Sequence, residues 1–243
     1  MQSKEWFQTW FDTKYYHLLY QNRNYEEANG FVKTLFQLLN LEKGSKILDL
    51  ACGKGRHALV MNQLGYDVTG VDLSENSIME ANKYANKYLS FEVQDMRYPL
   101  KDRKFDAIFN LFTSFGYFEN PSDNRKVIDA VHIMLEDNGI LVIDFMNVQK
   151  TMQNLVHEEQ KTVEGITFAI ERKIQNKHIC KTIHFEDNEE RFTFHERVQA
   201  ITMLDFEILF NSKFRILDVF GSYALEKFSE RDSDRLILIA QKY

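Results

Sequence analysis

The stretch ILDLACGKGR, residues 47–56, joins a short apolar segment to a turn that contains two glycines. Gly53 and Gly55 let the backbone approach a ligand closely, because no Cβ stands in the way. A helix expected to start at Arg56 would direct its free N–H groups toward an anionic or carboxylate group. Asp49, at the end of the apolar segment, can accept hydrogen bonds from an ammonium group or from the N–H groups of the turn. The stretch therefore predicts a strand, a ligand-binding turn and a helix.

Apolar strands and amphipathic helices alternate from residue 46 onward. Residues 1–43 are expected to be helical, and Ser74 and Ser122 are expected to cap two of the later helices. This alternation predicts a parallel sheet with helices on both faces. The expected strands are 46–50, 67–71, 89–93, 105–110 and 140–145, and the expected helices are 26–39, 56–64, 74–85 and 122–135.

The pattern changes after residue 147. Three long segments with partial alternation and polar turns predict an antiparallel β insertion over residues 148–201, a substrate lid or an oligomer contact. A helix over 203–210 and two strands then complete the core. The expected organisation is a core of residues 1–147 and 202–243 with an N-terminal helical cap. The insertion strands are expected at 166–174, 178–185 and 191–201, and the final strands at 214–220 and 236–241.

Two further acids follow the next two strands. Asp72 can accept hydrogen bonds from both hydroxyls of a ribose, or it can cap the following helix, although Ser74 is the better cap. Residues 53–58 also fit the G-x-G-x-x-G/A dinucleotide fingerprint, so a nicotinamide-dependent oxidoreductase is an alternative. Asp49 would repel a pyrophosphate but would favour the sulfonium and ammonium groups of S-adenosylmethionine. Asp95 can accept from the exocyclic amine of adenine.

Five motifs together carry a family resemblance over residues 45–145. The chain resembles class I S-adenosylmethionine-dependent methyltransferases, and its layout is similar to the small-molecule enzymes with an antiparallel lid, such as sugar N,N-dimethyltransferases and glycine N-methyltransferase-like enzymes. The resemblance implies an α/β fold with a Rossmann-like, doubly wound, seven-stranded sheet, whose last strand is antiparallel, plus the β insertion. It also implies methyl transfer from S-adenosylmethionine to nitrogen or oxygen of a small molecule. The motifs are LDLACGKGRHA, GVDLS, VQDM, FNLFTSFGYFE and LEDNGILVIDF.

The resemblance also assigns roles to single residues. The turn would hold the methionine end of the cofactor, the end of the second strand its ribose, and the end of the third strand its adenine. Ala51 stands where the family usually has glycine, and we expect a negative φ there. The expected cofactor-binding residues are Asp49, Ala51, Cys52, Gly53, Gly55, Arg56, Asp72, Leu73, Ser74, Asp95, Met96, Asn110, Leu111 and Phe112.

Two residues are candidates for catalysis. Methyl transfer is an in-line displacement that depends on alignment, so a general base is optional. Tyr117 lies in an aromatic loop expected beside the sulfonium, where it either stabilises a cation or packs in the core. His195 would act as a base if its strand face looks into the cleft; otherwise that face is solvated. Tyr15 or Tyr20 is expected to reach the cleft.

Composition narrows the partners. A net charge of −6 gives no attraction to nucleic acid, and 44% apolar residues suit a globular chain. Cys52 and Cys180 lack a metal-binding spacing, so no metal is expected. The N-terminus lacks the features of a signal peptide and no apolar run approaches about 20 residues, so we expect a cytoplasmic protein that does not contact membranes. Separately, a monomer or a homodimer is expected. A methyltransferase acting on protein or RNA and a non-enzymatic binder remain alternatives.

Overall fold

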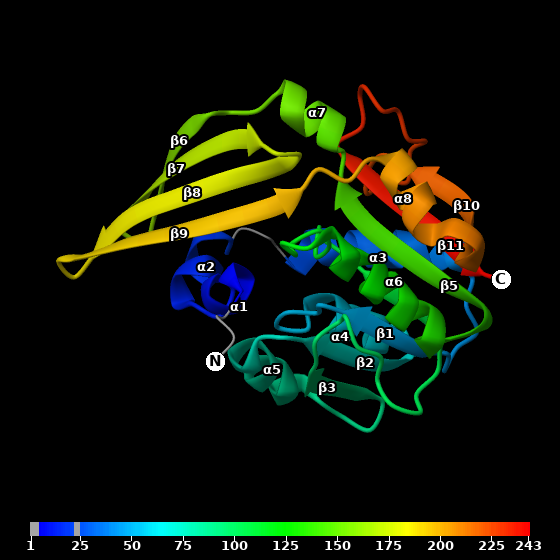
Figure 1. The fold of residues 1–243 in the computed structure, drawn as a ribbon. Coiled ribbons are helices and arrows are strands. Elements are labelled where there is room, and N and C mark those ends of the chain that lie inside the picture. The colour runs from blue at the N-terminus through cyan, green and yellow to red at the C-terminus, as the bar shows by residue number, and fades with distance from the viewer. Residues whose placement is uncertain (1–4, 22–24) are drawn as a thin grey trace.

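The core is a seven-stranded sheet with the order β10-β11-β5-β4-β1-β2-β3 (Figure 1). The computed structural model describes residues 5–21 and 25–243. Neighbouring strands from β1 to β5 pair in parallel, whereas β11 is antiparallel to both β5 and β10. The last strand is therefore antiparallel, as predicted. The strands are β1 (Lys46–Leu50), β2 (Asp67–Asp72), β3 (Leu89–Val93), β4 (Phe105–Asn110), β5 (Leu135–Met146), β10 (Phe214–Phe220) and β11 (Arg235–Lys242).

Helices cover both faces of this sheet. Ile47 packs in the apolar cluster on one face, and its neighbour Leu48 packs in the cluster on the other. Because successive side chains of a strand point to opposite faces, strands buried on both sides read as continuous apolar runs. One face carries α3 (Tyr25–Leu39), α4 (Arg56–Gln63) and α5 (Glu75–Ala81), and the other carries α6 (Pro121–Met134) and α8 (Met203–Phe210).

The strand order places a ligand-binding edge in the middle of the sheet. After β1 the chain continues outward to β2 and β3, and it then returns to place β4 on the other side of β1. In open sheets of this kind, ligands bind outside the carboxyl ends of the strands at the point where the order reverses. The turns that follow β1 and β4 therefore meet at one edge.

The insertion contains four strands rather than the three predicted. It begins with α7 (Val148–Gln153) and continues as an antiparallel sheet of β6 (Glu158–Val163), β7 (Ile166–Gln175), β8 (His178–Asp187) and β9 (Glu190–Gln199) (Figure 1). The sequence of β6, EEQKTV, buries only Val163. It is an edge strand with almost no apolar alternation, so its sequence gives no strand signal.

The N-terminal helices α1 (Trp6–Trp10) and α2 (Lys14–Leu19) pack on the inner face of the four-stranded sheet (Figure 1). The indole of Trp10 stacks on Phe194 with ring centroids 4.4 Å apart. Residues 1–4 and 22–24 of the predicted helical region lie outside the described residues. The N-terminal cap therefore joins the insertion to the core.

One helix start differs from the prediction. Ser122 was expected to cap α6, but Asn120 is the N-cap, and its side chain accepts a hydrogen bond from the Ser122 amide. Pro121 occupies the first turn, where its missing N–H leaves no unmet donor. Ser74 caps α5 as expected, accepting from the Ser77 amide.

Candidate active site

The turn after β1 uses left-handed backbone angles. Ala51, Gly53 and Gly55 have φ of 63°, 56° and 77°. A Cβ on Gly55 would stand 2.6 Å from the ring of Phe91, so only glycine fits there. The expected negative φ at Ala51 is wrong, because the chain must reverse direction at this residue to leave β1 and begin α4. Alanine therefore holds an angle that glycine would adopt more easily.

Asp72 joins the ends of two strands. Its Oδ2 accepts from the Gly53 amide at 2.8 Å and its Oδ1 accepts from the Ser74 amide at 2.9 Å. Burial raises the pKa of this carboxyl, although the three backbone N–H groups that point at it favour the charged form. The hydroxyl of Ser74 donates to Asp12 in the α1–α2 connection at 2.6 Å, so Ser74 serves the helix cap and the N-terminal segment.

Asp49 lies beneath the turn and is 1% exposed. Burial raises its pKa to about 7, and the negative charge of Asp72 acts in the same direction. Its Oδ2 has no hydrogen-bond partner among the described residues. A buried carboxylate oxygen without a donor fits a site that receives a cationic group.

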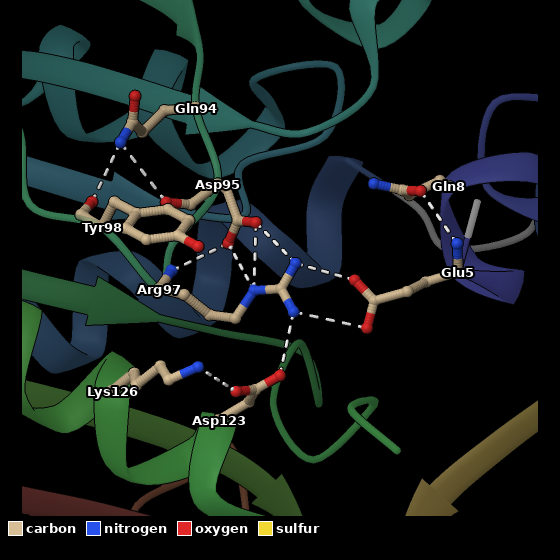
Figure 2. A network of polar contacts seen from close by, with 8 residues as sticks. All are labelled: Glu5, Gln8, Gln94, Asp95, Arg97, Tyr98, Asp123 and Lys126. Atoms are coloured by element: carbon tan, nitrogen blue, oxygen red, sulfur yellow. Dashed lines mark hydrogen bonds and ion pairs between the residues drawn. The ribbon is translucent and has the colours of Figure 1, made fainter. Parts of the chain in front are cut away.

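Asp95 is held by Arg97 (Figure 2). The guanidinium donates to both oxygens of Asp95, and also to Glu5 at the start of α1 and to Asp123 in α6. Figure 2 shows these three carboxylates arranged around one cation. The predicted adenine acceptor is thus a carboxylate fixed in place by Arg97, in a residue that lines the cavity at the strand ends.

The β4 exit completes this edge. Asn110 is buried and donates from Nδ2 to the Leu50 carbonyl at 2.9 Å, so it ties β4 to the turn from behind. Leu111 and Phe112 follow it, and both line a cavity at the strand ends.

These segments enclose a first cavity of about 290 Å³ at the strand ends. The predicted residues Asp49, Gly55, Ser74 and Asn110 do not line it; they shape the turns that surround it. The other predicted cofactor-binding residues all line it, namely Ala51, Cys52, Gly53, Arg56, Asp72, Leu73, Asp95, Met96, Leu111 and Phe112.

The N-terminal helices supply the far wall of the first cavity. Tyr20 lines it, as one of the two predicted tyrosines, whereas Tyr15 packs against Phe185 inside the insertion. His17 was not predicted to belong to the site. Burial lowers its pKa to about 4, and its Nε2 has no partner among the residues described. The wall formed by the N-terminal helices therefore includes the neutral ring of His17, whose Nε2 is buried.

A second cavity, of about 330 Å³, lies between the insertion and the core. Glu196 of β9 is central to its polar wall. It accepts from Trp10 at 2.8 Å, from Tyr20 at 2.7 Å and from the ammonium of Lys181 at 2.8 Å. Burial alone would raise the pKa of Glu196, but the charge of Lys181 and the three hydrogen bonds hold it below its usual value. Arg172 and Arg235 also line this cavity.

His195 lines neither cavity, so the condition for its predicted role as a base, a strand face that looks into the cleft, is not met. It is exposed on the outer face of β9 and contacts Thr182 at 3.2 Å. Phe192 and Phe194 pack on the opposite, inner face, which puts Glu196 inward with them. The apolar pair was the sequence signal for Glu196, because residues two apart on a strand share a face.

Two further histidines of the insertion, His178 and His184, differ in exposure. His178 was expected at the surface but is buried, with its Nδ1 2.7 Å from the Asn176 carbonyl. His184 is exposed, as expected.

Five aromatic side chains line both cavities, and we call them the aromatic junction. Tyr117, the second predicted catalytic residue, is one of them, and its ring meets the Phe11 ring edge to face at 5.2 Å. Trp6 of α1 holds the same segment by donating to the Tyr117 carbonyl. The junction consists of Phe11, Tyr16, Tyr20, Phe112 and Tyr117.

Residues 5–21 and 25–243, which the structure describes, contain neither a metal-binding cluster nor a membrane-spanning helix. No group of three or more histidine, cysteine, aspartate or glutamate side chains in this part is placed to hold a metal ion. No helix there is both long and apolar enough to span a bilayer.

A family model described as a methyltransferase domain matches residues 41–194. The chain is 30% identical over 132 residues to a glycine/sarcosine N-methyltransferase of Parasynechococcus marenigrum, covering 52% of this chain and 46% of that protein. It is 29% identical over 102 residues to the dTDP-3-amino-3,4,6-trideoxy-alpha-D-glucopyranose N,N-dimethyltransferase of Streptomyces venezuelae, covering 42% and 43%. The chain thus spans less than half the length of these two relatives.

A solved structure agrees over nearly the whole chain. An S-adenosylmethionine-dependent methyltransferase from Clostridium acetobutylicum superposes with a TM-score of 0.79 at 24% identity, covering 94% of this chain and 96% of that one. The shared fold includes the insertion as well as the core.

Proposed function

The chain belongs to the methyltransferase-domain family, and from that premise we propose that it transfers a methyl group from S-adenosylmethionine to a small-molecule acceptor. The observation that carries the proposal is the aromatic junction, where the first and second cavities meet. The cofactor would occupy the first cavity and the acceptor the second, and the methyl group would cross between them.

The residues of the first cavity suit this cofactor. Asp72 would accept from its ribose and the Asp49–Gly55 turn would hold its methionine end. Asp49 lies beneath that turn, and its Oδ2 has no hydrogen-bond partner among the described residues. S-adenosylmethionine, when bound, supplies a methyl group on a sulfonium, which is already electrophilic. The carboxylates favour its positive charges, whereas they would repel the pyrophosphate of a nicotinamide dinucleotide.

We place nitrogen first among the acceptor atoms. Both relatives described above are N-methyltransferases by name. A neutral amine attacks through its lone pair, the carbon–sulfur bond breaks with its electrons left on sulfur, and the new ammonium then sheds a proton to water. The faces of Phe112 and Tyr117 can stabilise that cation. The insertion would serve as the substrate lid, since its strands supply Arg172, Lys181 and Glu196 to the second cavity.

Binding and turnover test the proposal. Calorimetry should detect S-adenosylmethionine and its demethylated product, and not NADH; affinity for NADH alone would favour the oxidoreductase. Methyl transfer from labelled cofactor should then appear with small amines such as glycine, sarcosine or nucleotide-linked amino sugars. Methyl transfer only to hydroxyl groups, or only to protein or RNA, would contradict the proposal that the acceptor is a small amine.

Asp72→Asn tests the ribose contact. Loss of a charged acceptor should weaken S-adenosylmethionine binding roughly tenfold or more. The matched control is Asp67→Asn at the opposite end of the same strand, which should leave the affinity unchanged. Equal affinities for wild type and Asp72→Asn would refute the assigned role.

Tyr117 is proposed to act through its ring. Tyr117→Phe keeps the π face beside the junction and should retain most of the turnover, whereas Tyr117→Ala should lower kcat. If Tyr117→Phe is as slow as Tyr117→Ala, the hydroxyl group is the part that matters and the proposed role is wrong.

A further inference from the structure

The turn after β4 contains two consecutive strained residues. Phe112 and Thr113 have φ of 66° and 61°, and neither is glycine. Thr113 is β-branched, so its side chain crowds the backbone in this left-handed region. Two such residues in a row persist only where the surrounding structure fixes them, and such strain gathers at functional sites.

Asp144 of β5 fixes both residues. Its side chain is fully buried, and its Oδ2 accepts from the Phe112 amide at 2.9 Å. Its backbone carbonyl accepts from the Thr113 amide at 2.8 Å. One residue of the neighbouring strand therefore satisfies both N–H groups of the strained pair.

The same carboxylate orients Arg235. The Nε of Arg235 donates to Asp144 Oδ1 at 2.7 Å, and its Nη2 donates to the Thr113 hydroxyl at 3.0 Å. The hydroxyl of Tyr223 donates to Asp144 Oδ2 at 3.2 Å. Burial raises the pKa of Asp144, and Arg235 opposes that shift. The buried acid is thus the centre of a small network, and Arg235 reaches from it to the wall of the second cavity.

We propose that Asp144 is a positioning residue for methyl transfer: it holds the β4 exit in its strained form, and so sets both the Phe112 ring at the junction and Arg235 at the acceptor wall. The proposal rests on the proposed function, in that the second cavity receives the acceptor. Displacement of one wall by about 1 Å can slow such an aligned reaction about 10²-fold. Asp144 itself lines neither cavity.

Asp144→Asn is the first test. An amide has one acceptor oxygen for three donors, so the Phe112 amide should exchange its hydrogen with solvent roughly tenfold faster or more. With the acceptor found in the turnover screen, kcat should fall about 10²-fold. Asp137→Asn is the matched control, because Asp137 lies on the same strand with its side chain 91% exposed. It should change neither quantity.

A rescue separates positioning from general damage to the fold. Glycine enters the left-handed region freely, so Thr113→Gly added to Asp144→Asn should slow the exchange of the Phe112 amide again. It also removes the hydroxyl to which Arg235 donates, so kcat is not expected to recover. A general loss of structure would not respond to that change. If Asp144→Asn does not fold, Arg235→Lys is the second variant. It keeps the positive charge but loses the guanidinium that bonds both Asp144 and Thr113, so it should also speed exchange of the Phe112 amide and lower kcat.

Unchanged Phe112 exchange in Asp144→Asn and in Arg235→Lys would overturn the proposal, as would fast exchange in Asp144→Asn that Thr113→Gly does not slow. The exchange measurement needs no acceptor. Failure of the turnover screen would therefore count against the proposed function. Faster exchange of the Phe112 amide in Asp144→Asn would still show that Asp144 holds the turn after β4.

Discussion

Ala51 shows that a single methyl group can sit at a position the fold would give to glycine. Its φ of 63° carries a steric cost of about 1–2 kcal/mol that glycine avoids. Ala51→Gly should raise the free energy of unfolding by about 0.5–1 kcal/mol, because relief of that strain exceeds the added chain entropy. Urea unfolding measures this, and a destabilised variant would show that the alanine methyl group packs usefully.

Asp49 should make stability depend on pH. Its pKa is about 7 in the folded chain and near 3.8 when unfolded, so the folded state favours the neutral form. The stabilisation is complete below pH 4 and is lost as the pH rises toward 7, by up to about 4 kcal/mol. Comparison of wild type with Asp49→Asn over this range should isolate that slope. Parallel curves for the two proteins would contradict the shifted pKa.

At the scale of elements, Arg97 ties three parts of the fold together. It connects the start of α1, the β3 exit and α6 through Glu5, Asp95 and Asp123, and its side chain is 15% exposed (Figure 2). The exit loop that carries Asp95 is therefore fixed by a cation that the sequence pattern does not single out.

Arg97→Gln should cost about 3 kcal/mol of unfolding free energy, because three partly buried carboxylates lose their shared cation. It should also weaken cofactor affinity, since Asp95 becomes free to move. Lys83→Gln breaks an exposed pair with Glu80 and should leave the free energy of unfolding nearly unchanged, because solvent screens exposed pairs. Denaturation curves that coincide for the two variants would show that the network contributes nothing.

For the whole molecule, Trp10 joins the N-terminal cap to the insertion. It is 1% exposed, stacks on Phe194 and donates to Glu196. Trp10→Ala should cost about 3–5 kcal/mol. Trp10→Phe keeps a ring but leaves Glu196 without one donor, and should cost about 1–2 kcal/mol. Calorimetric melting of both variants tests this order, and equal losses would show that the polar contact carries the interface.

The part of the first cavity that the strand ends form could be predicted because each piece of it is local in the chain. A strand end, a turn with Gly53 and the following helix are contiguous, so periodicity and turn chemistry locate them, and Asp72 and Asp95 repeat the same relation at the next two strands. Four of the predicted residues support the cavity instead of lining it, since sequence adjacency does not tell which side of a turn a side chain takes.

The sequence by itself determined the parallel sheet with helices on both faces and the position of the first cavity, because hydrophobic periodicity and turn chemistry are set by local backbone geometry, and the family resemblance of its motifs implied the antiparallel last strand. Only the tertiary structure decided that Glu196 rather than His195 faces the second cavity, and that Asp144 and Arg235 brace Phe112. Those contacts join residues tens to more than a hundred positions apart. A strand reveals its two faces by alternation, but which face meets the core depends on what packs against it.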